Sequence, residues 1–312
     1  MIRYIEHSAL DKRKWDCCIE NAAMSPAYAL SWYLDIACEQ WDALVEDDYS
    51  AVMPLPWRKK GGIKYIYPPY FIQQLGIFST ATVGSAKTAA FLNAIPESFK
   101  YAEINLNSTN AVSELTLSYT RRTNTELQLN TPFEKIKSGY SDNLKRNLRK
   151  AVTSGNDLTD AVIPEALVTL FKHNKGAELN KFSEQDYAVL THLMKESIKR
   201  GAGFITGVCD DKNTLIAGAF FIQTGQRIIF LFSGAGAEAK ENAAIPQLLN
   251  NQIAAYADRQ MLLDFEGSDN KNLARFYKSF GSEETYYHRV IIDRLPKIAK
   301  YVIKWRRMLK KN

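Results

Sequence analysis

Two periods of apolar and polar residues run through the second half of the chain, and together they predict its strands and helices. Three apolar runs of strand length are separated by the turn-forming stretches DDKN and TGQ, which favours an antiparallel meander. Apolar residues at steps of three and four flank this meander and are typical of half-buried helices. In chain order the predicted elements are strand 157–163, helices 164–175 and 183–201, strands 204–210, 214–223 and 227–234, a helix within 237–260, strand 261–267, helix 269–280 and strand 285–293.

Proline, serine and glycine support the predicted ends of these helices. Pro164 suits the first turn of the first helix, Ser183 can cap the second helix, and Gly201 can end it. Pro246 is expected early in the third helix or at a kink within it. The helix boundaries are therefore better defined than the apolar pattern alone would make them.

The first half of the chain repeats this order in a weaker form. Its predicted elements are strand 1–5, helices 10–23 and 31–40, a meander within 41–79, helix 85–95 and strand 101–108. DDYSAVMPLP corresponds to DDKNTLIAGAFF, and AEINLNS corresponds to LLDFEGS, each about 160 residues later. We therefore predict an α/β protein with mixed sheets in two like domains, 1–140 and 141–293, followed by a basic helix at 294–312.

Length and composition fit two domains and exclude several classes of protein. The 312 residues exceed the roughly 150 expected of one domain, and 46% hydrophobic with 24% charged residues is typical of a globular chain. The start lacks the apolar run of a signal peptide, and no stretch approaches the roughly 18 apolar residues of a membrane span. The four cysteines lack metal-type spacing and only four histidines occur, so we expect a cytoplasmic protein without a metal site.

The element order resembles a known fold. Strand, two helices, three antiparallel strands, helix, strand, helix and strand is the order of the GNAT N-acyltransferases. Its doubling, with SDNLKRNLRKA entering the second copy and DFEGS…ARFYKSFG near its end, resembles the tandem-GNAT proteins related to the FemABX peptidyltransferases, over nearly the whole chain. The resemblance implies transfer of an amino acid or another acyl group to an amine, often in cell-envelope precursors, from aminoacyl-tRNA or acyl-CoA.

The chain departs from that group at the loop that holds the CoA pyrophosphate. GNAT enzymes that use acyl-CoA usually carry Q/R-x-x-G-x-G/A there, where backbone N–H groups at a helix start face the phosphates. The second copy has only Gly234 and Gly236 at this place, and the first copy has Ala81 where Gln or Arg belongs before Gly84. We therefore expect no tightly bound cofactor, with acyl-CoA or aminoacyl-tRNA as a co-substrate.

Asp264 and Glu266 are the first catalytic candidates. Side chains alternate across a strand, so these two acids are predicted to share one face while Leu263 and Phe265 share the other. An amine attacks a carbonyl only when its lone pair is free, so a carboxylate here can orient or deprotonate an ammonium group. The alternative is that both acids pair with basic neighbours or cap backbone N–H groups at the sheet edge.

The helix after this strand reads mainly as core and cap. Ser268 and Asp269 occupy the place of an N-cap, and the apolar spacing from Leu273 to Phe280 is typical of a buried face. Tyr277 is kept as a catalytic candidate because, in GNAT-type enzymes, a tyrosine of this helix can serve as the acid for the leaving group. Ser268 is kept as a substrate-binding candidate.

Basic residues gather in two segments. The segment 135–150 has six Lys or Arg against one acid, and a helix from Ser141 would expose them in like-charged pairs that suit a diphosphate or a nucleic-acid backbone. A solvated linker helix is the alternative. The tail 294–312 has eight Lys or Arg and an apolar stripe, which suits either an anionic membrane surface or docking on the first domain. The binding candidates of the first segment are Lys145, Arg146 and Arg149.

Polar residues elsewhere complete the candidate site. His173, Lys175 and Asn180 lie between two helices, where GNAT folds contact the acceptor, and His173 is the candidate base. The pair Gln73 and Gln74 borders an apolar strand and suits either a cleft or unpaired backbone groups. Further substrate-binding residues are expected near the end of strand 227–234, at Ser233.

Two functions follow from these patterns and stay open. The first is an N-acyltransferase or aminoacyl transferase acting on an amine-bearing, envelope-related acceptor by direct attack, because no Ser-His or Cys-His nucleophile is visible. The second is a non-catalytic protein of the same fold that contacts RNA or an anionic membrane surface through its basic segments. The sequence does not disclose donor, acceptor, acyl group or oligomeric state.

Overall fold

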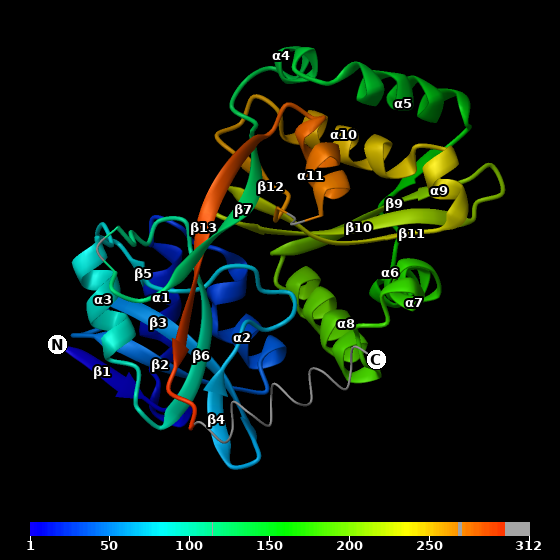
Figure 1. The fold of residues 1–312 in the computed structure, drawn as a ribbon. Helices are drawn as coiled ribbons and strands as arrows, with labels where there is room; N and C mark the ends of the chain where they lie inside the picture. Colours follow the sequence, from blue (N-terminus) through cyan, green and yellow to red (C-terminus); the bar gives the residue numbers. More distant parts are fainter. Residues whose placement is uncertain (114, 268–269, 297–312) are drawn as a thin grey trace. The chain divides into compact units, whose positions relative to one another are not determined.

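The computed structural model describes residues 1–113, 115–267 and 270–296, and its chain divides into two compact units (Figure 1). The first unit contains Met1–Met24, Cys38–Arg121 and the described residues from Tyr287 on; the second contains Ser25–Ala37 and Arg122–Tyr286. Each unit has helices packed on a mixed sheet, so the predicted α/β class is confirmed. The predicted basic helix lies outside the described residues, apart from its first three positions.

The sheet of the first unit has the order β1-β2-β3-β4-β6-β13, and β5 pairs with β3. All neighbours on this path are antiparallel except β4 and β6, which are parallel. The elements are β1 (Ile2–Ile5), α1 (Lys12–Glu20), β2 (Gln40–Glu46), β3 (Ala51–Lys60), β4 (Ile63–Ile66), β5 (Phe78–Ser79), α3 (Ser85–Asn93), β6 (Phe99–Leu106) and β13 (Glu283–Asp293). Val290 and Ile292 of β13 are buried in the same core as Phe99, so the last strand of the sequence completes the first unit.

The sheet of the second unit has the order β7-β12-β11-β10-β9-β8, in which only β11 and β12 are parallel. Its strands are β7 (Tyr119–Gln128), β8 (Asp157–Thr159), β9 (Gly203–Cys209), β10 (Leu215–Thr224), β11 (Arg227–Ala235) and β12 (Leu262–Asp264). Its helices are α2 (Ser31–Ala37), α4 (Phe133–Ser138), α5 (Asp142–Thr153), α6 (Pro164–Phe171), α7 (Ala177–Leu179), α8 (Glu184–Lys199), α9 (Ala237–Glu241), α10 (Ala244–Tyr256) and α11 (Lys271–Lys278). Helices α10 and α11 cover one face of this sheet, and α6 and α8 cover the other (Figure 1).

Four of the predicted helix ends can be compared with the structure at Ser183, Gly201, Pro164 and Pro246. Ser183 caps α8 in a reciprocal capping box with Asp186, and Gly201 follows that helix with a positive φ of 68°. Pro164 is the first residue of α6, and Pro246 is the third residue of α10. The predicted helix 164–175 is interrupted, because α6 passes into a π-turn over Lys172–Gly176 before the short α7.

The strand that carries Asp264 is shorter than predicted, so Glu266 lies in the bend after the strand and not on the strand itself. Strand β12 ends at Asp264, and Glu266 has a left-handed backbone with φ of 52°. The chain bends there because Gly267 lies against the backbone of β7, where a side chain would overlap Thr123 and Asn124. The N-cap of α11 is Asn270, rather than Ser268 or Asp269, which lie outside the described residues.

We predict that Gly267→Ala lowers the free energy of unfolding by about 1–3 kcal/mol, because the new methyl group meets backbone that cannot move aside. Gly84→Ala is the matched control, since Gly84 has a negative φ and open space where the methyl group would lie. Urea denaturation of both variants measures the difference. Equal stability of the two variants would contradict the close packing of the 265–267 bend on β7.

Candidate functional site

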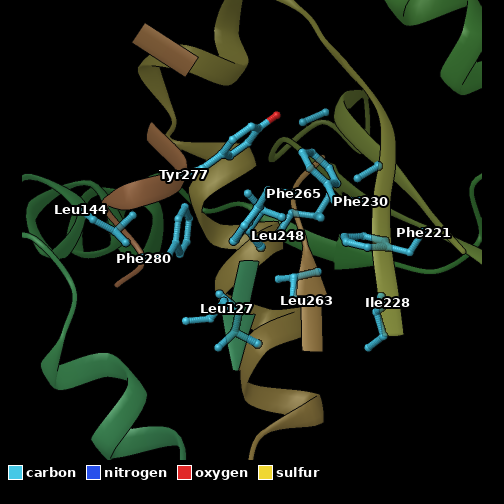
Figure 2. Packing of buried hydrophobic residues seen from close by; sticks show 14 of the residues in the cluster. Leu127, Leu144, Phe221, Ile228, Phe230, Leu248, Leu263, Phe265, Tyr277 and Phe280 are labelled. Atoms are coloured by element: carbon cyan, nitrogen blue, oxygen red, sulfur yellow. The ribbon is translucent and has the colours of Figure 1, made fainter. Parts of the chain in front are cut away.

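The end of β12 brings together charged and polar side chains on one face of the second sheet. Asp264 lies in register with Ile229 of the parallel strand β11 and with Glu126 of the antiparallel strand β7. Its neighbours in sequence point the other way: Leu263 and Phe265 pack with Phe230 in the core between the sheet and its helices (Figure 2). One face at this strand end is therefore dry core, and the other carries the acids.

Asp264 is completely buried and its carboxylate is held from three sides. Oδ1 accepts hydrogen bonds from Asn124 Nδ2 at 3.0 Å and from the Glu266 backbone N–H at 2.8 Å, while Oδ2 is paired with Arg227 Nη1. The same Arg227 Nη1 lies 2.8 Å from Glu126 Oε1. Burial outweighs the guanidinium and raises the pKa of Asp264 above its usual range. These contacts make Asp264 a fixed support for the bend at Glu266.

Glu266 has a different environment from Asp264. The residue is half-buried, yet its Oε1 is shielded from solvent and has no hydrogen-bond partner among the described residues. Burial, followed by the nearby Asp264 carboxylate, holds the pKa of Glu266 well above that of an ordinary glutamate. A carboxylate with a raised pKa binds a proton more strongly than an exposed glutamate does, which suits a general base.

Two further buried polar atoms near Glu266 lack partners in the described part of the chain. The Tyr28 side chain is 0% exposed with its hydroxyl unbonded, and Asn124 is 1% exposed with its Oδ1 unbonded. Burial raises the pKa of Tyr28, and the carboxyls of Glu266 and Asp264 add to the increase, so the phenol stays protonated in their vicinity. Buried polar groups are normally hydrogen-bonded, so these atoms mark a site rather than ordinary core.

The sequence prediction omitted four residues of this cluster: Tyr28, Asn124, Glu126 and Arg227. The alternation of Asn124 and Glu126 with Thr125 and Leu127 is a strand signal that could have been found. No sequence signal places Tyr28 here, because the segment Ser25–Ala37 belongs to the first repeat and packs with the second unit, where α2 contacts α8.

Tyr277 lies mainly in the core. Its ring stacks on Phe265 with centroids 4.9 Å apart, and Figure 2 shows the hydroxyl pointing out of the cluster. Burial raises the pKa of Tyr277, and the Glu266 carboxyl adds to the increase. The phenol is therefore protonated, and the charge of Glu266 helps to keep it so.

No hydrogen bond or ion pair of the described residues joins the other candidates to Glu266. His173 and Lys175 are exposed in the π-turn, and Lys175 Nζ pairs with Glu178 at 2.5 Å. Asn180 ends α7 in a left-handed conformation. Ser233 is half-buried on β11, in register with Ala219 of β10, and Ser268 lies outside the described residues.

Helix α5 presents an unpaired basic face. Ser141 caps it as predicted, and Leu144 and Ala151 turn inward. Arg146 and Arg149 are exposed and contact only Asn143 and a backbone oxygen, at 3.4 Å in both cases. In the part of the chain that the structure describes, no acid forms an ion pair with the basic residues of this helix. They are Lys145, Arg146, Arg149 and Lys150.

The equivalent strand end of the first unit has its polar groups paired. Asn105 donates to Gln73 O at 2.8 Å and accepts from Arg289 Nε at 3.0 Å, and Arg289 Nη1 lies 2.9 Å from Glu103 Oε1. Gln74 Nε2 donates to Gln73 Oε1 at 2.7 Å, and Gln74 Oε1 accepts a hydrogen bond from the Ser108 backbone N–H. The hollow beside Gln73 has room for about one water molecule. The second unit differs from the first at this strand end, because acceptor atoms around Glu266 have no hydrogen-bond partner among the described residues.

Metal-binding and membrane-spanning features were also sought in residues 1–113, 115–267 and 270–296. These residues contain no group of three or more His, Cys, Asp or Glu placed to hold a metal ion. The four cysteines are free thiols, of which only Cys17 is exposed. No helix in these ranges combines the length and the apolar character needed to cross a bilayer.

No protein-family model matches the chain, and no curated protein matches its sequence. Solved structures match almost its full length. FemX is 11% identical with a TM-score of 0.66, and the match covers 96% of this chain and 99% of FemX. The C-terminal domain of a putative lysylphosphatidylglycerol synthetase from Agrobacterium fabrum is 10% identical with a TM-score of 0.57, covering 94% and 95%. A tandem GNAT protein from the clavulanic acid biosynthesis pathway is 13% identical with a TM-score of 0.54, covering 95% and 100%.

These identities bear on the fold alone. The chain has the tandem GNAT-like, FemX-related fold that the element order predicted, which is a fold of acyltransferase and aminoacyltransferase-like proteins. The matches extend over both halves of the chain, in agreement with the internal repeat.

We predict that Arg227→Met lowers the free energy of unfolding by about 3–5 kcal/mol at neutral pH, because it leaves the Asp264 and Glu126 carboxylates buried without a cation. The loss should shrink as the pH falls, since the unpaired carboxylates then take up protons. Lys175→Met, which removes an exposed pair with Glu178, should cost less than about 1 kcal/mol. Denaturant titrations at several pH values measure both; a loss for Arg227→Met as small as the control's would refute a structural role for this network.

Proposed function

We propose that the chain is an N-acyltransferase or aminoacyl transferase whose active site lies at the end of β12 in the second unit. The observation that carries the proposal is Glu266, a carboxyl with a raised pKa and a buried, unpartnered Oε1, held in a left-handed bend by Asp264. The FemX-like fold supports the reaction class. Perturbed carboxyls without structural partners are common at catalytic sites.

Glu266 acts as the general base in this scheme. Its carboxylate takes a proton from the ammonium group of the acceptor, which frees the nitrogen lone pair. The lone pair attacks the carbonyl carbon of the donor, the C–N bond forms, and the ester or thioester bond breaks with its electron pair leaving on oxygen or sulfur, which takes up the second proton that the nitrogen loses. Attack is direct, so the enzyme carries no acyl group. A protonated phenol such as Tyr277 can donate a hydrogen bond, whereas its raised pKa makes it a poor proton donor.

The donor is proposed to be phosphate-bearing, either aminoacyl-tRNA or acyl-CoA. The unpaired basic face of α5 supports this, because Arg and Lys without acidic partners attract phosphates. The turn after β11 favours aminoacyl-tRNA, since it has neither the expected Gln or Arg nor a long helix directly after Gly236. An amine-bearing, envelope-related acceptor is proposed from the resemblance in element order, and the likeness to a lysylphosphatidylglycerol synthetase domain supports the envelope-related part.

The direct test is acyl transfer with purified protein. Radiolabelled aminoacyl-tRNA pools and acetyl-CoA serve as donors, and amines, amine-bearing peptides and aminated lipids serve as acceptors. Formation of an amide that depends on the protein supports the proposal. Absence of transfer with every donor and acceptor pair, from protein that is folded by circular dichroism, contradicts it.

We predict that Glu266→Gln lowers kcat by about 10²–10⁴-fold, because the amide cannot accept the proton. The same variant should be more stable than the wild type at neutral pH, since the folded wild type must ionise a buried carboxyl and Gln need not. A raised pKa contributes stability below the unfolded value of about 4.5 and loses it as pH rises. The gain in Tm should therefore be absent near pH 4 and grow toward pH 8.

Measuring both the rate and the Tm of Glu266→Gln separates a catalytic role of Glu266 from a loss of fold. Glu178→Gln, at an exposed ion pair, should change neither the rate nor the pH dependence of Tm. A slow Glu266→Gln variant that is less stable than the wild type at every pH would show a structural role for Glu266 instead. Wild-type rates in Glu266→Gln would exclude it as the base.

We predict that Arg146→Glu with Arg149→Glu weakens tRNA binding at least tenfold and lowers the slope of log Kd against log salt by about 2, because two phosphate contacts are lost. Circular dichroism should show no loss of helix, since both side chains are exposed. Lys199→Glu with Lys212→Glu changes the same number of exposed charges elsewhere and serves as the control. Equal tRNA affinity of the two double variants would exclude the basic face as the donor surface.

A further inference from the structure

Three buried atoms beside Asp264 can accept hydrogen bonds and receive none in the described structure. They are Glu266 Oε1, Asn124 Oδ1 and the Tyr28 hydroxyl oxygen. An unsatisfied buried polar group destabilises the folded state, so three together need a reason. Thr125 Oγ1 is also unpartnered, but alternation along β7 places it with Leu127 on the core face of the sheet.

The residues that carry the three acceptors surround Asp264. Asn124 and the backbone of Glu266 both donate to the same oxygen, Asp264 Oδ1, at 3.0 and 2.8 Å. Besides burial, the charges of Glu266, Asp264 and Arg227 shift the pKa of Tyr28, and Tyr28 in turn contributes to the raised pKa of Arg227. Four elements therefore converge here: the Ala27–Ala29 turn, β7, β11 and the bend after β12.

Two hydrogen bonds fix the orientation of the Asn124 side-chain amide, so the atom without a partner is its carbonyl oxygen. Its Nδ2 donates to Asp264 Oδ1 and to Glu126 Oε1, so the carbonyl oxygen must face away from these acids. The surrounding charge is negative as well, because one guanidinium, from Arg227, faces the two carboxylates of Asp264 and Glu126. Acceptor atoms in a negative field suit a cationic group that carries several N–H donors.

We propose that Tyr28, Asn124 and Glu266 together bind the primary ammonium group of the acyl acceptor. A primary ammonium has three N–H bonds, one for each free acceptor. When Glu266 takes one proton, a lone pair takes the place of that N–H bond. The amine then turns so that the lone pair faces the donor, and one of its two remaining protons passes to the leaving oxygen or sulfur as the amide forms. The inference rests on the proposed function for the identity of the amine as acceptor, and it adds the residues that select it.

The number of N–H bonds also selects among amines. Tyr28 and Asn124 are almost completely buried, whereas Glu266 is half-buried. Secondary and quaternary amines offer fewer N–H donors and more bulk, so they are poor acceptors.

Binding of n-butylammonium tests the inference without any donor, so its outcome is independent of whether transfer occurs. Calorimetry should detect binding of n-butylammonium to the wild type, and butyltrimethylammonium, which has no N–H, should bind at least tenfold more weakly. Tyr28→Phe should weaken n-butylammonium binding about tenfold and leave Tm unchanged or higher, because an unpaired hydroxyl is removed.

Tyr140→Phe is the matched control. The Tyr140 hydroxyl is also buried and unpartnered among the described residues, but Tyr140 packs in the hydrophobic core against Phe280. This variant should bind n-butylammonium as the wild type does. Equal binding of the two ammonium ions by the wild type, or undiminished binding by Tyr28→Phe, overturns the inference. The first of these comparisons needs no variant and remains decisive if Tyr28→Phe fails to fold.

Discussion

The ion pair of Arg227 with Asp264 and Glu126 is the interaction on which the second unit's site depends. It joins three neighbouring strands, β11, β12 and β7, through one partly buried guanidinium. Buried carboxylates are costly unless a cation and hydrogen bonds compensate them, and here Asn124 and the Glu266 N–H supply the hydrogen bonds. Because Asp264 is fixed in this way, it fixes the bend that presents Glu266, and Gly267 allows that bend to lie against β7.

The two units use the same fold with opposite chemical results at equivalent strand ends. In the first unit, Arg289 of β13 pairs with Glu103 and Asn105 and leaves these groups satisfied. In the second unit the balance favours the acids, and Glu266 is left with a buried oxygen that accepts no hydrogen bond from the described residues. Such an arrangement costs stability, which is the usual sign that a residue is placed for function.

The sequence predicted the element order, the internal repeat and most helix ends, because each depends on local periodicity and capping. Capping by Ser183 and Ser141 and the place of Pro246 followed from such local rules. The end of β12 did not, because it is set by the backbone of β7, about 140 residues away in sequence. Tyr28 could not be assigned to the site either, since only tertiary packing brings a segment of the first repeat into the second unit.

The central claim is that Glu266 is a buried carboxyl kept available for a proton. Its titration can be followed directly by NMR of protein labelled with 13C at the glutamate carboxyl carbons, with Glu266→Gln to assign the resonance. The account predicts that this resonance titrates well above the ordinary value of about 4.5, and that n-butylammonium lowers its midpoint. A Glu266 resonance that titrates with the exposed glutamates, unchanged by the amine, would contradict it.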